Sequence, residues 1–207
     1  MKARRILICG AAPVLKIHMG ERSLDFDYIV AVDGGYDTLL GFGLVPDIYI
    51  GDLDSVKNEV VCKKEISSKD KDESDLGLAL KYIFSKFSKI EDIIVLGVIS
   101  QIRLDHTLSN IFTLLEYDNN FEILCDSLRI LVLNSIGKYD FNVATGDRIS
   151  LFTFCNGKIE ARGLKFQLPE VFKTHSHGIS NIAISNKVSV DIKSGKFLIM
   201  LFKGNQN

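Results

Sequence analysis

Carboxylates recur where apolar runs end in the first half of this sequence. Asp52 and Asp54 stand one residue apart in the segment DIYIGDLDSV, and Asp33 ends an earlier run. Asp75 and Asp105 each open a stretch with helical spacing. Carboxylates that gather repel one another unless a cation lies among them, and Mg²⁺ prefers one or two carboxylates together with phosphate and water oxygens. The pattern therefore indicates a magnesium site that handles phosphate groups.

Each of these acids also has a structural explanation when it is taken alone. An isolated Asp-x-Asp more often forms a turn than a metal site. Asp75 and Asp105 suit the first turn of a helix, because the N–H groups there favour negative charge. Their shared position at strand ends and helix starts favours a site over these separate explanations. We expect Leu53, between Asp52 and Asp54, to point into the core.

The stretch DHTLSNIFTLL adds further polar groups. On a helix, His106, Asn110 and Thr113 fall on one stripe. The apolar residues of the opposite stripe are Leu108, Ile111, Phe112 and Leu115. Arg103 precedes this helix and could bind a phosphate through two parallel hydrogen bonds. The alternative is an ordinary amphipathic helix with a solvated polar face, in which His106 is structural.

Five apolar runs position these groups: RILICG, YIVAVDGG, DIYIGD, DIIVLG and FEILCD. Near-continuous apolar runs are typical of parallel strands buried on both faces, and SDLGLALKYIFSKF and DHTLSNIFTLLEY between them have helical spacing. Ligands of such sheets bind outside the carboxyl ends of the strands, so we expect the acids to meet in one crevice. Gly34 and Gly35 beside Asp33 would let the backbone approach a phosphate closely.

The rhythm changes from about Leu128. Short strand-like runs follow one another there without any helix-length pattern, which is typical of a small antiparallel sandwich or barrel. We therefore predict an α/β fold in two domains. Residues 1–133 form a catalytic α/β domain with an open, mainly parallel sheet and flanking helices. Residues 134–207 form a small all-β, sandwich-like domain.

Composition excludes several classes of function. Lys and Arg total 25 and Asp and Glu total 26, a net charge of -1, so no global electrostatic argument supports a nucleic acid or a membrane as partner. No apolar run is long enough to cross a bilayer. The four cysteines are scattered and form no C-x-x-C pair, which predicts a reduced, cytoplasmic protein without a zinc site. Neither a P-loop nor a G-x-G-x-x-G motif is present.

Several blocks together resemble the thiamine pyrophosphokinase family. They are DGGYDTLLGFGLVPDIYIGDLDS, KDESDLGLAL, RLDHTLSN, GLKFQL and SHGISN, and their order and spacing match over nearly the whole chain. The resemblance implies an α/β domain joined to a small β-domain, in a homodimer whose subunits share the active site. It also implies transfer of the pyrophosphoryl group of ATP to the hydroxyl of thiamine, with release of AMP and with Mg²⁺ as cofactor.

The resemblance further implies the site residues, matched motif by motif. The catalytic aspartates would be Asp52, Asp54, Asp75 and Asp105. Mg²⁺ on the ATP phosphates would be held by Asp52, Asp54, Asp75 and Asp72. ATP would be bound by Asp33, Gly34, Gly35, Arg103, His106 and Asn110. Thiamine would be bound by Phe166, Ser180 and Asn181. An aspartate would accept the hydroxyl proton.

The sequence departs from the family pattern in the loop before Arg103, where Ser100, Gln101 and Ile102 replace the usual glycine pair. We interpret His175 and His177 as loop residues and not as metal ligands. Two other functions compete. An Asp-x-Asp phosphatase would carry the motif near the chain start and a later Lys with an acidic pair, an arrangement absent here. A non-catalytic sensor of thiamine or nucleotide would not need the aspartates.

Overall fold

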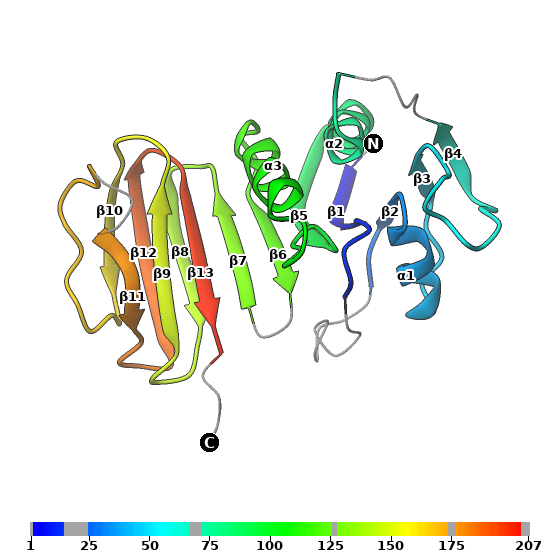
Figure 1. Ribbon diagram of the computed structural model, residues 1–207. Coiled ribbons are helices and arrows are strands. Elements are labelled where there is room, and N and C mark those ends of the chain that lie inside the picture. Colours follow the sequence, from blue (N-terminus) through cyan, green and yellow to red (C-terminus); the bar gives the residue numbers. More distant parts are fainter. Residues whose placement is uncertain (1, 15–24, 67–71, 126–127, 174–176, 204–207) are drawn as a thin grey trace. The chain divides into compact units, whose positions relative to one another are not determined.

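The computed structural model describes residues 2–14, 25–66, 72–125, 128–173 and 177–203 (Figure 1). The chain forms two compact units. The first comprises Met1–Leu114 with Ile123–Asp126, and the second comprises Leu115–Glu122 with Ser127–Asn207. Among the described residues, no helix combines the length and the apolar character that a membrane span requires.

A mainly parallel sheet forms the centre of the first unit. Its strands are β1 (Lys2–Cys9), β2 (Tyr28–Val32), β3 (Ile48–Gly51), β4 (Lys63–Ile66), β5 (Lys89–Leu96) and β6 (Phe121–Cys125). They lie in the order β6-β5-β1-β2-β3-β4. The pairs β5–β1, β1–β2, β2–β3 and β3–β4 are parallel, which confirms the predicted orientation. The sequence did not predict β4, because its residues KKEI are all exposed and carry no apolar pattern.

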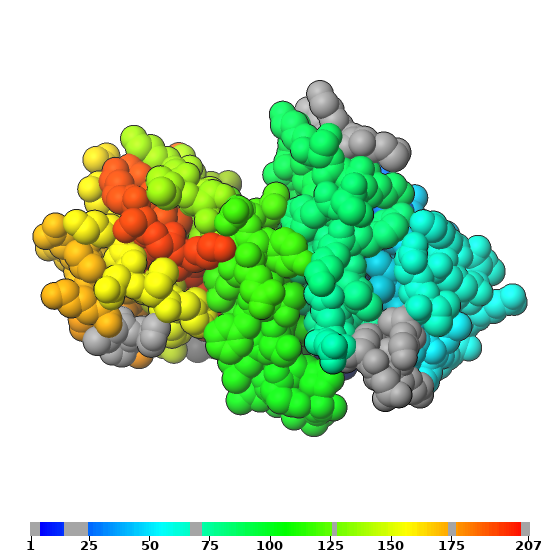
Figure 2. Space-filling model, turned by 90° about the horizontal axis from the view of Figure 1, so that it is seen from above, coloured from blue at the N-terminus to red at the C-terminus, as the bar shows by residue number. Residues whose placement is uncertain are grey.

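The helices of this unit are α1 (Gly35–Gly41), α2 (Asp75–Lys86) and α3 (Leu104–Leu115). Helix α2 begins where Ser74 caps it, because the Ser74 hydroxyl accepts a hydrogen bond from the N–H of Gly77 at 3.2 Å. Its buried residues Leu76, Leu80 and Ile83 follow the predicted helical spacing. Figure 2 shows the blue-green atoms of the α2 region and the green atoms of the α3 region on the same face of this unit.

The predicted apolar stripe of α3 is wrong in part. Thr107, Ile111 and Leu114 are the buried residues, whereas Leu108 is 46% exposed and Phe112 is 49% exposed. The reason is local, because the Thr107 side chain exchanges two hydrogen bonds with the backbone of the loop before the helix. These bonds turn Thr107 inward and set the face that packs.

The second unit is a β-sandwich. Its strands are β7 (Leu128–Leu133), β8 (Gly137–Asn142), β9 (Arg148–Thr153), β10 (Lys158–Arg162), β11 (Gly178–Ile182), β12 (Lys187–Ser194) and β13 (Phe197–Phe202). They form the orders β11-β9-β13-β7 and β10-β12-β8 with antiparallel pairing. One apolar core contains residues of both sheets, and within it the rings of Phe172 and Phe197 meet edge to face at 5.5 Å.

The division between the units differs from the boundary at residues 133 and 134 that the sequence suggested. Strand β7 lies in the second unit, where Leu133 pairs with Phe197 and Leu128 pairs with Phe202 of β13. The partner strand lies at the far end of the chain. A local apolar pattern therefore contains no information about which unit β7 joins.

Candidate functional site

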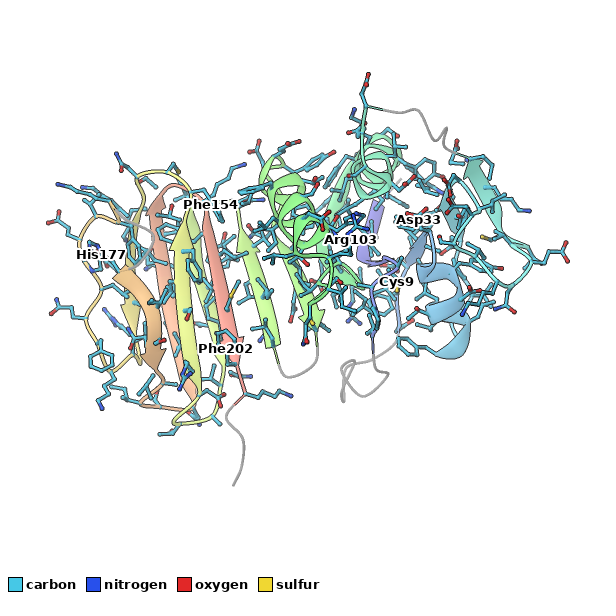
Figure 3. The ribbon with its side chains drawn as sticks, viewed as in Figure 1. Cys9, Asp33, Arg103, Phe154, His177 and Phe202 are labelled. Carbon is cyan, nitrogen blue, oxygen red and sulfur yellow. The ribbon has the colours of Figure 1, made fainter. Side chains whose placement is uncertain are left out.

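The carboxyl ends of β1, β2 and β5 open onto a cavity of about 420 Å³ in the first unit. Residues 10–13 after β1 and Asp33 after β2 line it, together with the start of α2 at Asp75. Helix α3 contributes His106 and Asn110, and Arg103 precedes that helix. Asp33 and Arg103 are labelled in Figure 3. Five of the predicted site residues therefore line one cavity at the strand ends, whereas Asp52, Asp54 and Asp105 are not among its lining residues.

Gly10 and Gly97, which the sequence analysis did not single out, also line this cavity. A β-carbon added to Gly10 would lie 2.5 Å from the carbonyl oxygen of Gly97, and one added to Gly97 would lie 2.1 Å from that of Gly10. The N–H of Ala12 donates to the Gly97 oxygen at 2.9 Å. The backbones after β1 and β5 therefore touch, which only glycine allows. The signal in the sequence is a glycine directly after each apolar run.

Gly34 and Gly35 lie at the start of α1 and not in the cavity lining. A β-carbon on Gly35 would lie 1.9 Å from the carbonyl oxygen of Cys9, so this glycine lets α1 begin against the end of β1. Neither Gly34 nor Gly35 is among the residues that line the cavity. Their contact with a nucleotide stays a prediction.

Arg103 binds its neighbour Asp105 through two hydrogen bonds. The Nε group donates to Oδ1 at 3.0 Å and the Nη2 group donates to Oδ2 at 2.8 Å, while Nη2 also contacts Nε2 of His106. This guanidinium lowers the pKa of Asp105 to about 2. Both side chains are exposed, so water competes for the pair and its net contribution to stability is small. A phosphate group can therefore replace the carboxylate on Arg103.

Side chains hold the loop that carries Arg103 at three points. The Ser100 hydroxyl accepts from the Arg103 N–H at 3.1 Å, and the Thr107 hydroxyl donates to the Ser100 carbonyl at 3.0 Å. The Asn110 amide donates to the Val98 carbonyl at 2.9 Å. Ser100 thus closes the turn at the position where the family pattern has glycine. In the sequence, the serine three residues before Arg103 is the feature that could have predicted this turn.

The Asp-x-Asp segment forms a tight turn. The Asp54 N–H donates to Oδ1 of Asp52 at 3.1 Å, and Leu53 between them has a φ of 69°. The expectation that Leu53 points into the core was wrong, because its side chain is 39% exposed. The left-handed backbone at Leu53 breaks the alternation of a strand. A non-glycine residue rarely adopts this conformation unless its surroundings impose it.

Tyr49 supplies that constraint, although the sequence analysis did not select it. Its buried hydroxyl accepts a hydrogen bond from the Leu53 N–H. A β-carbon on Gly51 would lie 2.6 Å from this hydroxyl and 2.2 Å from Oδ1 of Asp33, so both groups approach the same glycine. Burial, together with the negative charges of Asp33, Asp52 and Asp75, raises the pKa of Tyr49 to about 12.

These carboxylates suit a magnesium ion that is bound together with a nucleotide. Besides burial, the negative charges of Asp33, Asp52 and Asp75 raise the pKa of the Tyr49 hydroxyl, so the negative potential of the three carboxylates overlaps at this hydroxyl. Within the part of the chain that the structure describes, no three His, Cys, Asp or Glu residues are close enough to hold a metal by themselves. Mg²⁺ usually takes only one or two carboxylates and fills its shell with phosphate and water oxygens. Asp54 and Asp72, which are near Asp52 and Asp75 in the sequence, are both exposed.

The predicted thiamine residues lie in the second unit. The Phe166 side chain is 54% exposed and Ser180 is exposed, whereas Asn181 is 3% exposed. The Asn181 amide is engaged with backbone groups, chiefly those of Phe166. His177 is exposed in this unit (Figure 3), and His175 lies outside the described residues.

The first unit belongs to the class of α/β proteins whose parallel strands end at a cavity, here lined by carboxylates and an arginine. A family model described as "Thiamin pyrophosphokinase, catalytic domain" matches residues 23–125. The chain belongs to the thiamine pyrophosphokinase family.

Solved structures agree in fold. The thiamine pyrophosphokinase of Bacillus subtilis matches with a TM-score of 0.80 at 21% identity, over 97% of this chain and 100% of that one. The protein of Geobacillus thermodenitrificans matches with a TM-score of 0.80 at 24% identity, over 98% and 99% of the two chains. That of Candida albicans matches with a TM-score of 0.75 at 16% identity, over 96% and 90%. No curated protein matches the chain by sequence.

Proposed function

We propose that this protein is a Mg²⁺-dependent thiamine pyrophosphokinase, which transfers the pyrophosphoryl group of ATP to the hydroxyl of thiamine and forms thiamine diphosphate and AMP. The observation that carries the proposal is the cavity at the ends of β1, β2 and β5. It brings Asp33, Asp75 and Arg103 to one place, as a polyphosphate and its cation require. Membership of the family supplies the identity of the two substrates.

Binding and orientation account for most of the catalysis in this proposal. Phosphoryl transfer needs in-line positioning and charge neutralisation more than a covalent protein group. Arg103 leaves Asp105 and grips a phosphate of ATP through two parallel hydrogen bonds. Carboxylates from among Asp52, Asp54, Asp75 and Asp72 would hold Mg²⁺ together with phosphate oxygens, and the ion would supply positive charge to those oxygens.

The proton of the thiamine hydroxyl goes to an aspartate. Asp105 is a poor acceptor while Arg103 lowers its pKa to about 2. When Arg103 turns to a phosphate, the pKa of Asp105 rises toward its ordinary value. Asp105 therefore becomes a better base at the moment when the nucleotide is in place.

The second unit supplies the thiamine side of the proposal. The exposed ring of Phe166 offers a face for stacking, and the thiazolium of thiamine is a cation that such a face attracts. Ser180 lies exposed in the same unit. We further propose a homodimer whose subunits share the active site. None of the four cysteines, all of which lie in the described residues, forms a disulfide, which supports a reduced cytoplasmic location for the enzyme.

The decisive assay mixes the protein with thiamine, ATP and Mg²⁺ and follows AMP and thiamine diphosphate. We expect the two products in equal amounts, and no AMP when thiamine is left out. Formation of ADP, or release of phosphate without thiamine, would contradict a pyrophosphokinase. For the dimer, the mass is measured by sedimentation during turnover, and an active monomer would contradict the shared site.

A further inference from the structure

The side chain of Asn181 forms hydrogen bonds to both backbone polar groups of Phe166. Its Oδ1 accepts from the N–H of Phe166 at 3.0 Å, and its Nδ2 donates to the carbonyl of Phe166 at 2.8 Å. Oδ1 also accepts from the N–H of Ile182 at 2.9 Å. The opposite orientation of the amide would set donor against donor, so the contacts define it. Asn181 is 3% exposed, and its amide oxygen has both of its acceptor sites in use.

The backbone before Phe166 is fixed in the same direction. The Lys165 N–H donates to the carbonyl of Ile182 at 2.8 Å, and Leu164 pairs with Ala183 as an antiparallel bridge. The side chain of Asn181 therefore continues this backbone pairing to Phe166, where it takes the place of a partner strand. Both backbone polar groups of Phe166 are therefore bound, while Phe166 itself is 54% exposed.

A β-bulge makes the contact possible. The register of β11 against β9 shifts between Gly178 and Asn181, and Ser180 has a φ of 56°. In a regular strand, residues 179 and 181 would share a face. Here Ile179 is 50% exposed and Asn181 is buried, so the bulge turns the amide inward. The Ser180 N–H donates to the Ser150 hydroxyl at 3.1 Å, which holds the bulge.

We propose that Asn181 is a positioning residue, which fixes the backbone beneath the Phe166 ring so that the ring is already ordered when an aromatic substrate stacks on it. This role rests on the proposed function and replaces the direct thiamine contact that the family resemblance implied for Asn181. A ring that is ordered before binding loses less conformational freedom when the ligand arrives. Loss of the amide should therefore weaken thiamine binding through Phe166 alone.

The first test reads the ring directly and needs no catalysis. The chain contains no tryptophan, so Phe166→Trp introduces a single reporter, whose anisotropy measures mobility and whose quenching by thiamine measures binding. We expect Asn181→Ala in this background to lower the anisotropy and to weaken thiamine binding roughly three- to tenfold. The control is Asn134→Ala, which removes another buried asparagine that donates to a backbone carbonyl of the same unit. This control should leave the reporter unchanged.

The second test is a double-mutant cycle on the thiamine KM, with Phe166→Ala and Asn181→Ala. We expect Asn181→Ala to raise the thiamine KM in the wild-type background and to add nothing when Phe166 is already alanine, with the ATP KM unchanged in both. Asn181→Asp keeps the oxygen that accepts from the N–H groups of Phe166 and Ile182 but sets a second oxygen against the Phe166 carbonyl, so it should weaken thiamine binding as well. Melting temperatures identify variants that fail to fold.

The outcomes separate the two proposals. An unchanged anisotropy after Asn181→Ala, or additive effects in the cycle, would overturn the positioning role, since additivity is the result expected of a direct contact. A wild-type protein that forms no thiamine diphosphate would refute the proposed function instead. In that case the anisotropy comparison still decides whether Asn181 orders the ring.

Discussion

The hydroxyl oxygen of Tyr49 accepts a hydrogen bond from the backbone N–H of Leu53 across 3.0 Å. This bond joins the buried strand β3 to the turn that holds Asp52 and Asp54. Leu53 has left-handed backbone geometry, which is costly for a leucine. The turn therefore keeps its shape because a buried phenol anchors it. Strain of this kind, held by the surrounding structure, is consistent with a turn that presents carboxylates to a ligand.

Tyr49→Phe tests this anchor. The change removes the acceptor of the Leu53 N–H, so we expect the magnesium concentration for half-maximal activity to rise several-fold and stability to fall by about 1 kcal/mol. Magnesium titrations of activity and urea unfolding measure the two effects. Tyr36→Phe is the matched control. Its hydroxyl is also hydrogen-bonded, accepting from the Val61 N–H at 3.1 Å, and its ring packs edge to face on Tyr49. A similar change in the magnesium dependence of Tyr36→Phe would count against a specific role of Tyr49.

Arg103→Ala should weaken ATP binding selectively. Removal of a charged, two-point contact to phosphate costs roughly 1.5–3 kcal/mol, so we expect the ATP KM to rise roughly tenfold to a hundredfold. The thiamine KM and the melting temperature should change little, because the Arg103–Asp105 pair is exposed. Arg103→Lys keeps the charge without the planar fork and should recover only part of the affinity. Equal losses of affinity for both substrates would show that Arg103 acts on the fold and not on ATP.

The pH dependence of stability should contain a contribution from Asp105. Its pKa is lowered from 3.8 to about 2 by the hydrogen bonds from Arg103. A group with a lowered pKa stabilises the folded state above the pKa of the unfolded chain, and this contribution disappears as the pH falls toward the lower, folded value. Asp105→Asn should therefore flatten the decline in stability between pH 3.8 and about 2. Unfolding free energies measured across this range check it, and identical slopes for the two proteins would refute the assignment.

Asp54→Asn should abolish turnover while the fold stays intact. The amide has the size of the carboxylate but not its charge, and we expect a fall in kcat of at least about a hundredfold. Circular dichroism and melting temperature serve as the test of folding. Chelation of the metal with EDTA should stop the wild-type enzyme, and added Mg²⁺ should restore it. Wild-type activity in Asp54→Asn would remove this residue from the metal site.

The sequence by itself determined the parts of this protein that depend on local pattern. Apolar runs that end in Gly or Asp specified parallel strands, and the carboxyl ends of parallel strands lie at one edge of a sheet. Asp33 and Asp75 therefore reach one cavity, as their places in the sequence predicted, while Asp52 and Asp54 are not among its lining residues. The cap at Ser74 and the buried face of α2 follow from the same short-range rules.

Only the tertiary structure decided the parts that depend on partners distant in the chain. Strand β7 joins the second unit because it pairs with β13 over its whole length, and α3 buries Thr107 because that hydroxyl bonds to the preceding loop. Gly10 is needed because Gly97 touches it, and Asn181 faces Phe166 because a bulge turns it inward. These contacts join separate segments of the chain, so no helical or strand periodicity relates the residues involved. Their identities follow from packing in space, which no local pattern contains.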